Sequence, residues 1–147
     1  QTDLTFSWKV GFEHVEVPGG HCFWVRRVAL TLHHPVPDIY VAREYPRGSC
    51  NYRAILAHEQ AHVRTTRTVI DRYRTRLHWV LTSLRIPTVE RPRLTDSPER
   101  AEQAIGALMR ELAEPVFEEI ASALREAQAR LDSPRSYQQV FASCRRW

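Results

Sequence analysis

The residues best suited to chemistry lie in one short stretch, His58-Glu59-Gln60-Ala61-His62. If this stretch is helical, positions i and i+4 lie about 40° apart on one face, with about 6 Å between their Cβ atoms. Two imidazoles at that spacing can bind one zinc ion at about 2.0–2.1 Å each. Glu59 is offset by about 100°, where its carboxylate can exchange a proton with a metal-bound water. The pattern predicts His58 and His62 as metal ligands, Zn2+ as the cofactor and Glu59 as the catalytic base.

The residues around this motif have the periodicity of a long helix. No glycine or proline occurs from Asn51 to Ile86, and apolar side chains recur at helical spacing through this range. The sequence therefore predicts a helix from about Asn51 to Arg85 that carries the motif. The alternative is an ordinary buried helix face, on which two histidines find hydrogen-bond partners and Glu59 is a solvated charge.

A catalytic zinc site needs a third protein ligand beside the two histidines. The extended motif of the metzincin class requires glycine and histidine at two positions after the helix motif, and Thr65 and Thr68 stand there instead. No acidic residue lies between Asp71 and Glu90. The third ligand is therefore expected from a second helix, the β-rich part or the C-terminal tail.

A second helix is predicted from about Pro98 to Leu131. If it packs antiparallel to the first, residues 118–124 lie opposite the histidines, and the acids there are Glu118 and Glu119. Helical phase places Glu119 on the apolar face and turns Glu118 away from it. A carboxylate on an apolar face needs a strong partner such as zinc. We expect Glu119 as the third ligand, with Glu118 as the next candidate and a Glu–Arg ion pair as the alternative.

The first third of the chain has the pattern of β structure. Strands are predicted at residues 4–10, 12–17, 21–34 and 39–44, separated by turns rich in proline and glycine. Pro115 is expected to bend or split the second helix, and a short tail reaches Trp147. With 147 residues and 43% hydrophobic content, one domain is expected over residues 1–147. The predicted fold is α+β: a small antiparallel sheet followed by a long antiparallel helical hairpin carrying the HExxH motif, a zincin-like arrangement.

Three cysteines, Cys22, Cys50 and Cys144, lack the paired spacing of zinc ribbons. A helical hairpin returns the end of its second helix to the start of its first, which brings Cys144 near Cys50. We expect a Cys50–Cys144 disulfide, with Cys22 free and buried in the sheet. Such a bridge indicates an oxidising compartment, whereas three free thiols would indicate a reducing one.

The order of a β-rich front, Cys50, Tyr52, the HEQAH helix and a helical tail with a cysteine resembles a family of bacterial predicted secreted zinc-dependent proteases. The resemblance covers residues 20–145, and its specific part is Cys50 to His62. It implies export to the periplasm or outside the cell, zinc, and peptidase activity. It also supports His58 and His62 as ligands and Glu59 as the base, and it implies no particular substrate.

Composition limits the remaining function classes. The net charge is +4, and Lys9 is the single lysine among 21 basic residues. A basic balance permits an anionic partner, but the arginines of the first helix spread over several faces, so no nucleic acid is expected. No apolar run is long enough for a membrane span. The chain begins with Gln1, as expected of a processed or trimmed product.

The sequence thus predicts a secreted or periplasmic zinc metallopeptidase that hydrolyses peptide or protein substrates, with the cell envelope as a possible source. One alternative is an amidase acting on cell-wall peptides. Another is a non-catalytic binding domain stabilised by its metal. The number of metal ligands separates an enzyme from a binding domain. A catalytic zinc site has three protein ligands and an open position, and a structural zinc site has four protein ligands.

Overall fold

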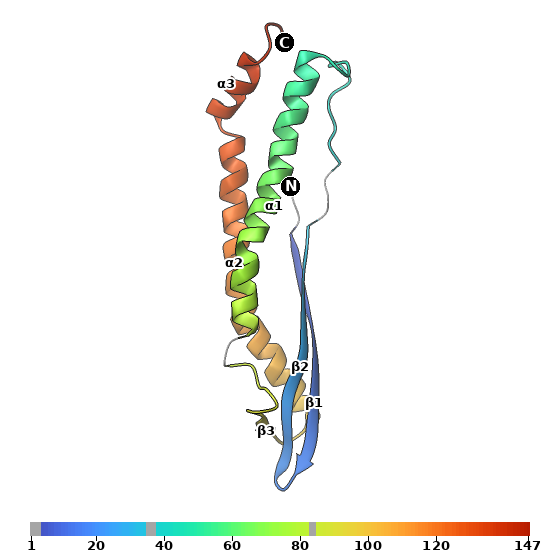
Figure 1. Ribbon diagram of the computed structural model, residues 1–147, viewed down its shortest axis with the longest axis vertical. Helices are drawn as coiled ribbons and strands as arrows, with labels where there is room; N and C mark the ends of the chain where they lie inside the picture. The colour runs from blue at the N-terminus through green and yellow to red at the C-terminus, as the bar shows by residue number, and fades with distance from the viewer. Residues whose placement is uncertain (1–3, 35–37, 83–84) are drawn as a thin grey trace. The chain divides into compact units, whose positions relative to one another are not determined.

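The computed structural model describes residues 4–34, 38–82 and 85–147. Its elements follow in the order β1 (Thr5–Val17), β2 (Gly20–His33), α1 (Cys50–Leu81), β3 (Arg93–Thr95), α2 (Pro98–Leu131) and α3 (Pro134–Ala142) (Figure 1). The strands form one antiparallel sheet in the order β1-β2-β3. The protein is therefore α+β, as predicted. No helix in the described part of the chain has the length and apolar character of a membrane span.

The chain divides into two compact units, and both long helices contribute to each of them. Among the described residues, unit 1 comprises 38–72 and Glu119–Trp147, and unit 2 comprises 4–34, 73–82 and 85–118. Unit 1 thus contains the first part of α1, the last part of α2 and all of α3. Unit 2 contains the sheet and the remaining parts of α1 and α2. The HExxH motif and both cysteines of the predicted disulfide belong to unit 1.

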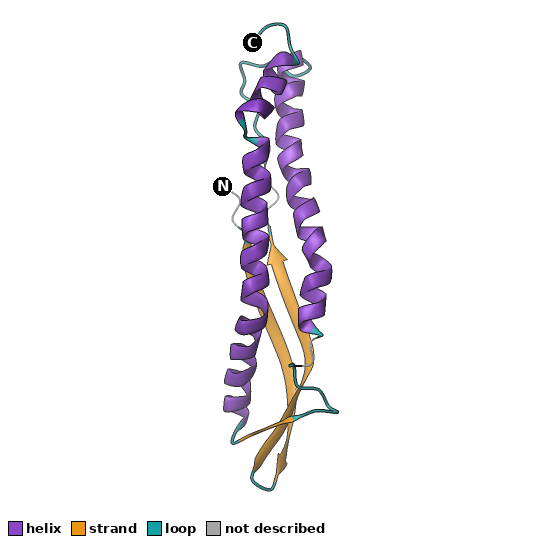
Figure 2. Ribbon diagram, turned by 90° about the vertical axis from the view of Figure 1, so that its left-hand side faces the viewer, coloured by secondary structure: helices purple, strands orange, loops and turns teal. Residues whose placement is uncertain are grey.

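In unit 2, β1 and β2 form a long hairpin (Figure 2). Thr5 pairs with His33 and Val17 with Gly20, so two residues make the turn. Gly19 has a φ of 93°, a conformation that favours glycine. A Cβ atom on Gly20 would lie 2.4 Å from the Thr95 carbonyl oxygen, so the close approach of β3 also requires glycine there.

The prediction of β structure in the first third of the chain was correct up to His33 and wrong after it, and it divided the first strand in two. The two strands expected at 4–10 and 12–17 are one strand, β1, with a register shift between Gly11 and Phe12. Residues 39–44 form no strand; Tyr40 in that segment is 84% exposed, and the backbone makes turns instead. β3 was not predicted, because three residues are too few to show an alternating pattern.

The core of unit 2 lies between the sheet and α2. Alternate residues of β1 face inward, as expected of a strand with one buried face. The most buried side chains are Phe23, Ala101, Ile105 and Met109, and Trp8, Val10, Phe12, Val25, Val28 and Leu81 pack against them. This apolar contact holds the hairpin on the helix.

In unit 1, the first part of α1 and the last part of α2 lie side by side (Figures 1 and 2). Thr66 and Val69 are buried on α1, and Ile120 and Leu124 are buried on α2. α2 is continuous from Pro98 to Leu131 with Pro115 inside it, so the proline does not split the helix. Ser97 is the N-cap of α2, because the Ser97 Oγ accepts a hydrogen bond from the Arg100 amide at 3.3 Å.

The predicted disulfide is present: Cys50, the first residue of α1, is bonded to Cys144, just after α3. Cys22 is free, as predicted, and is half-buried on β2 instead of fully buried. The bridge places α3 beside the start of α1 (Figure 1). A second link supports this placement, because the Asn51 side-chain amide donates to the Arg146 carbonyl at 2.7 Å.

Candidate metal centre

The two histidines of the motif face the same side of α1, as the i, i+4 spacing predicts. Their Nε2 atoms lie 3.2 Å apart, and their side chains are only 7% and 20% exposed. The face continues along the helix through buried Thr66 and Val69. His58 and His62 therefore extend the row of side chains that packs against α2, and buried imidazoles on such a row need polar partners.

A carboxylate meets the two imidazoles. Asp132 directly follows α2, and its amide still donates a helical hydrogen bond to the Gln128 carbonyl at 3.0 Å. Its Oδ1 lies 3.1 Å from the Nε2 of His62 and 3.5 Å from the Nε2 of His58. Among the described residues, these three make up the group of side chains whose ligand atoms could hold one metal ion.

Glu119, the predicted third ligand, does not lie in this group. It is on α2, twelve residues before Leu131, which corresponds to about 18 Å along a helix. The expectation assumed that the facing ends of the helices are level, so that residues 118–124 oppose the histidines. In the structure Gln128 contacts His62, so the facing position is further along α2, and Glu118 is displaced with Glu119.

Asp132 could have been found from the sequence. Ile120 and Leu124 belong to the inward row of α2, and the next positions of that row at i+4 spacing are Gln128 and Asp132. Asp132 is also the single acidic residue from 127 to 147. The next residue, Ser133, is the N-cap of α3, so Asp132 lies at the junction between the two helices.

Glu59 and Tyr137 flank the group. Tyr137 on α3 lies with its ring centroid 5.2 Å from that of His58, and its hydroxyl donates to Asp132 Oδ1 at 3.2 Å. This hydrogen bond and the negative charge of Asp132 raise the pKa of Tyr137, and the charge of half-buried Glu59 adds to the effect. Glu59 itself directly follows His58 on α1.

Three elements hold this arrangement. α1 supplies both imidazoles, the end of α2 supplies the carboxylate, and α3 supplies the phenol. α3 starts directly after the carboxylate, with the Ser133 hydroxyl accepting from the Ser136 amide at 3.3 Å. The Cys50–Cys144 bridge fixes the far end of α3 to the start of α1. The carboxylate and the phenol are therefore restrained on both sides.

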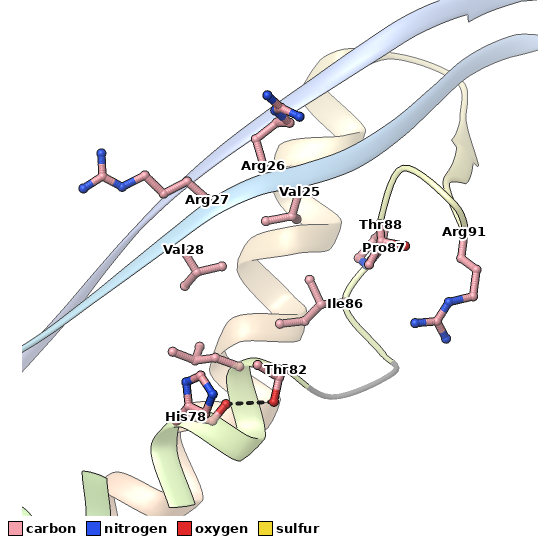
Figure 3. Close-up of a pocket in the computed structure, with 11 residues that line it drawn as sticks. Val25, Arg26, Arg27, Val28, His78, Thr82, Ile86, Pro87, Thr88 and Arg91 are labelled. Carbon is pink, nitrogen blue, oxygen red and sulfur yellow. Dashed lines mark hydrogen bonds between the residues drawn. The ribbon is translucent and has the colours of Figure 1, made fainter. Parts of the chain in front are cut away.

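Unit 2 contains a separate pocket of about 340 Å³ beside β2 (Figure 3). Its basic residues are Arg26, Arg27, Arg91 and His78, and Arg26 is paired with Glu13 at 3.3 Å. The His78 carbonyl accepts from the Thr82 hydroxyl at 3.1 Å. The described residues that line it include no carboxylate and no cysteine, so they supply no acid–base pair and no set of metal ligands.

Comparisons with protein-family models, with curated proteins and with solved structures gave no match to this chain. The resemblance to secreted zinc-dependent proteases therefore stays a prediction. The functional argument depends on the geometry of His58, His62, Asp132 and their neighbours.

Proposed function

We propose that this protein is a zinc-dependent metallopeptidase in which His58, His62 and Asp132 bind the metal and Glu59 is the general base. The observation that carries the proposal is the convergence of three donor atoms at 3.1, 3.2 and 3.5 Å from one another. In a tetrahedral site with zinc–ligand distances of about 2.0–2.1 Å, ligand atoms are about 3.3 Å apart. The three separations therefore match those between ligand atoms around one zinc ion.

The number and type of donors favour a catalytic site over a structural one. The described residues contribute three donors, the number found in catalytic zinc sites, whereas structural sites have four. Two imidazoles and one carboxylate also suit Fe2+. Glu59 beside the group favours zinc hydrolysis, because that reaction needs a proton acceptor next to the metal.

Each neighbouring side chain has a defined part in the proposed reaction. Bound zinc would polarise the scissile carbonyl and lower the pKa of a bound water. Glu59 accepts a proton from the attacking water and passes it to the leaving amine. A phenol is protonated at neutral pH, so the Tyr137 hydroxyl can donate a hydrogen bond to the oxyanion after giving up its bond to Asp132.

The same proposal includes an exported location and a peptide or protein substrate. The Cys50–Cys144 disulfide is compatible with an extracellular or periplasmic protein, since such bonds persist in oxidising compartments. The substrate class follows from the chemistry of the His-Glu-x-x-His pattern. A cell-envelope peptide is one member of that class.

Metal analysis and one substitution test the proposal. We expect purified protein loaded with zinc to retain about one ion per chain and to cleave members of a defined peptide library. Glu59→Gln should keep the zinc and lose at least about 100-fold in rate, the lower range for general acid–base catalysis. Glu126→Gln, which changes an exposed glutamate on α2, is the matched control.

Three results would contradict the assignment. Wild-type protein that retains no zinc would refute the metal centre and leave only polar contacts between the histidines and Asp132. Preferential retention of iron would refute the choice of zinc. Loss of zinc together with activity in Glu59→Gln would make Glu59 a ligand instead of the base.

A further inference from the structure

Gln128 on α2 contacts one turn of α1 at three points. Its Nε2 donates to the Thr66 hydroxyl at 2.8 Å and to the His62 carbonyl at 3.3 Å, and its Oε1 lies in hydrogen-bond contact with the Nδ1 of His62. Thr66 is 3% exposed, and Gln128 is half-buried. A single side chain therefore fixes both the backbone and the ring of His62.

These contacts favour one of the two ring nitrogens of His62 as the one that carries the proton. The His62 carbonyl can only accept a hydrogen bond, so the NH2 group of Gln128 must face it. The oxygen of the amide then faces Nδ1 of His62, and because that oxygen can only accept, Nδ1 carries the hydrogen. When the ring is neutral this is its one N–H, so Nε2 has a lone pair that a cation can use. The Nε2 of His62 lies 3.1 Å from Asp132 Oδ1 and 3.2 Å from the Nε2 of His58, and without a cation Asp132 competes with Gln128 for the proton of the ring.

We infer that Gln128 is a positioning residue that holds His62 in the Nδ1–H tautomer and fixes its ring, so that Nε2 is ready to bind a divalent cation. The role in metal binding rests on the proposed function. The tautomer of His62 does not, because it can be measured in metal-free protein. Outer partners of this kind raise metal affinity by about 10–100-fold. Gln128 is thus expected to contribute that factor without touching the metal or the substrate.

An amide suits this position because it both accepts and donates. The acceptor oxygen acts on the ring, whereas the donor nitrogen satisfies buried Thr66 and the His62 carbonyl. Two substitutions of Gln128 separate the role of the oxygen from that of the nitrogen. Gln128→Glu keeps an acceptor and loses the donor, and Gln128→Leu loses both. Thr66→Val removes one partner of the donor and leaves the acceptor in place.

The experiment measures zinc affinity, stability and the tautomer in the same set of proteins. Zinc affinity is measured by competition with a chromogenic chelator, and stability by urea unfolding of metal-free protein. The tautomer is measured by ¹⁵N NMR of metal-free protein in alkaline buffer, where a free imidazole is neutral. Gln103→Leu, which changes an exposed glutamine on the same helix, is the control.

We expect zinc affinity to depend on a hydrogen-bond acceptor at residue 128, and stability to depend on the hydrogen-bond donor of its amide. Gln128→Leu should bind zinc about 10–100-fold more weakly, while Gln128→Glu, Thr66→Val and Gln103→Leu remain within a few-fold of the wild type. Both Gln128 variants should lose stability, since each leaves buried polar groups without a donor. The NMR spectrum should show Nδ1–H for His62 in the wild type and a mixture in Gln128→Leu.

The outcomes separate this inference from the proposed function. Wild-type protein that binds zinc, with equal affinity in Gln128→Leu, overturns the role of Gln128 and leaves the metal centre intact. Wild-type protein that binds no zinc refutes the proposed function. The tautomer of His62 then decides by itself whether Gln128 positions the ring. His62 protonated at Nε2 in metal-free wild type overturns the inference whatever the variants do, including any that fail to fold.

Discussion

Removing the Cys50–Cys144 disulfide is expected to destabilise the protein strongly. The substitution replaces neither a histidine nor the carboxylate of the metal centre. The bridge joins positions separated by 94 residues. In the chain-entropy model, closing a loop of that length stabilises the folded state by about 4.7 kcal/mol at 25 °C. The free energy of unfolding of a domain is typically about 5–15 kcal/mol, so removing the bridge should cost roughly a third to nearly all of it. At about 2–4 °C per kcal/mol, Tm should fall by roughly 10–20 °C.

Urea unfolding of the double variant Cys50→Ser/Cys144→Ser, followed by circular dichroism, measures this loss. Cys22→Ser is the matched control, because it changes a half-buried cysteine that makes no bridge. The m-value should also rise in the double variant, since the unfolded chain without the bridge is more expanded. A free energy within about 1 kcal/mol of the wild type, with an unchanged m-value, would refute the reasoning, because that is the ordinary effect of a point mutation.

Two further predictions concern Asp132. Asp132→Asn should weaken zinc binding by more than the roughly 10–100-fold typical of an outer partner, while Glu119→Gln leaves it unchanged in chelator competition; weaker binding in Glu119→Gln would return the third ligand to α2. Asp132→Asn should also lower the pKa of Tyr137, because it removes the charge that, through a hydrogen bond, raises that pKa. Phenolate absorbance of metal-free protein against pH, with Tyr137→Phe as the reference, measures the change, and an unchanged pKa would exclude the hydrogen bond in solution.

The features that the sequence predicted are those that local chemistry specifies. Helical spacing places His58 and His62 on one face wherever the helix packs, because i and i+4 are neighbours in any α-helix. Alternation of inward residues specified the β1–β2 hairpin in the same way. The Cys50–Cys144 bridge followed from the order of the helices, since a returning helix brings its end back to the start of the first.

Features that depend on how two distant segments align were decided by the tertiary structure alone. The third member of the group is Asp132 and not Glu119, because Gln128 is the residue of α2 that contacts His62 and Thr66, and Asp132 lies one turn beyond it. A shift of one helical turn, about 5.4 Å, is larger than the distances that join the donor atoms. The sequence by itself therefore determined which residues could bind a metal, and the packing of the helices determined which of them meet.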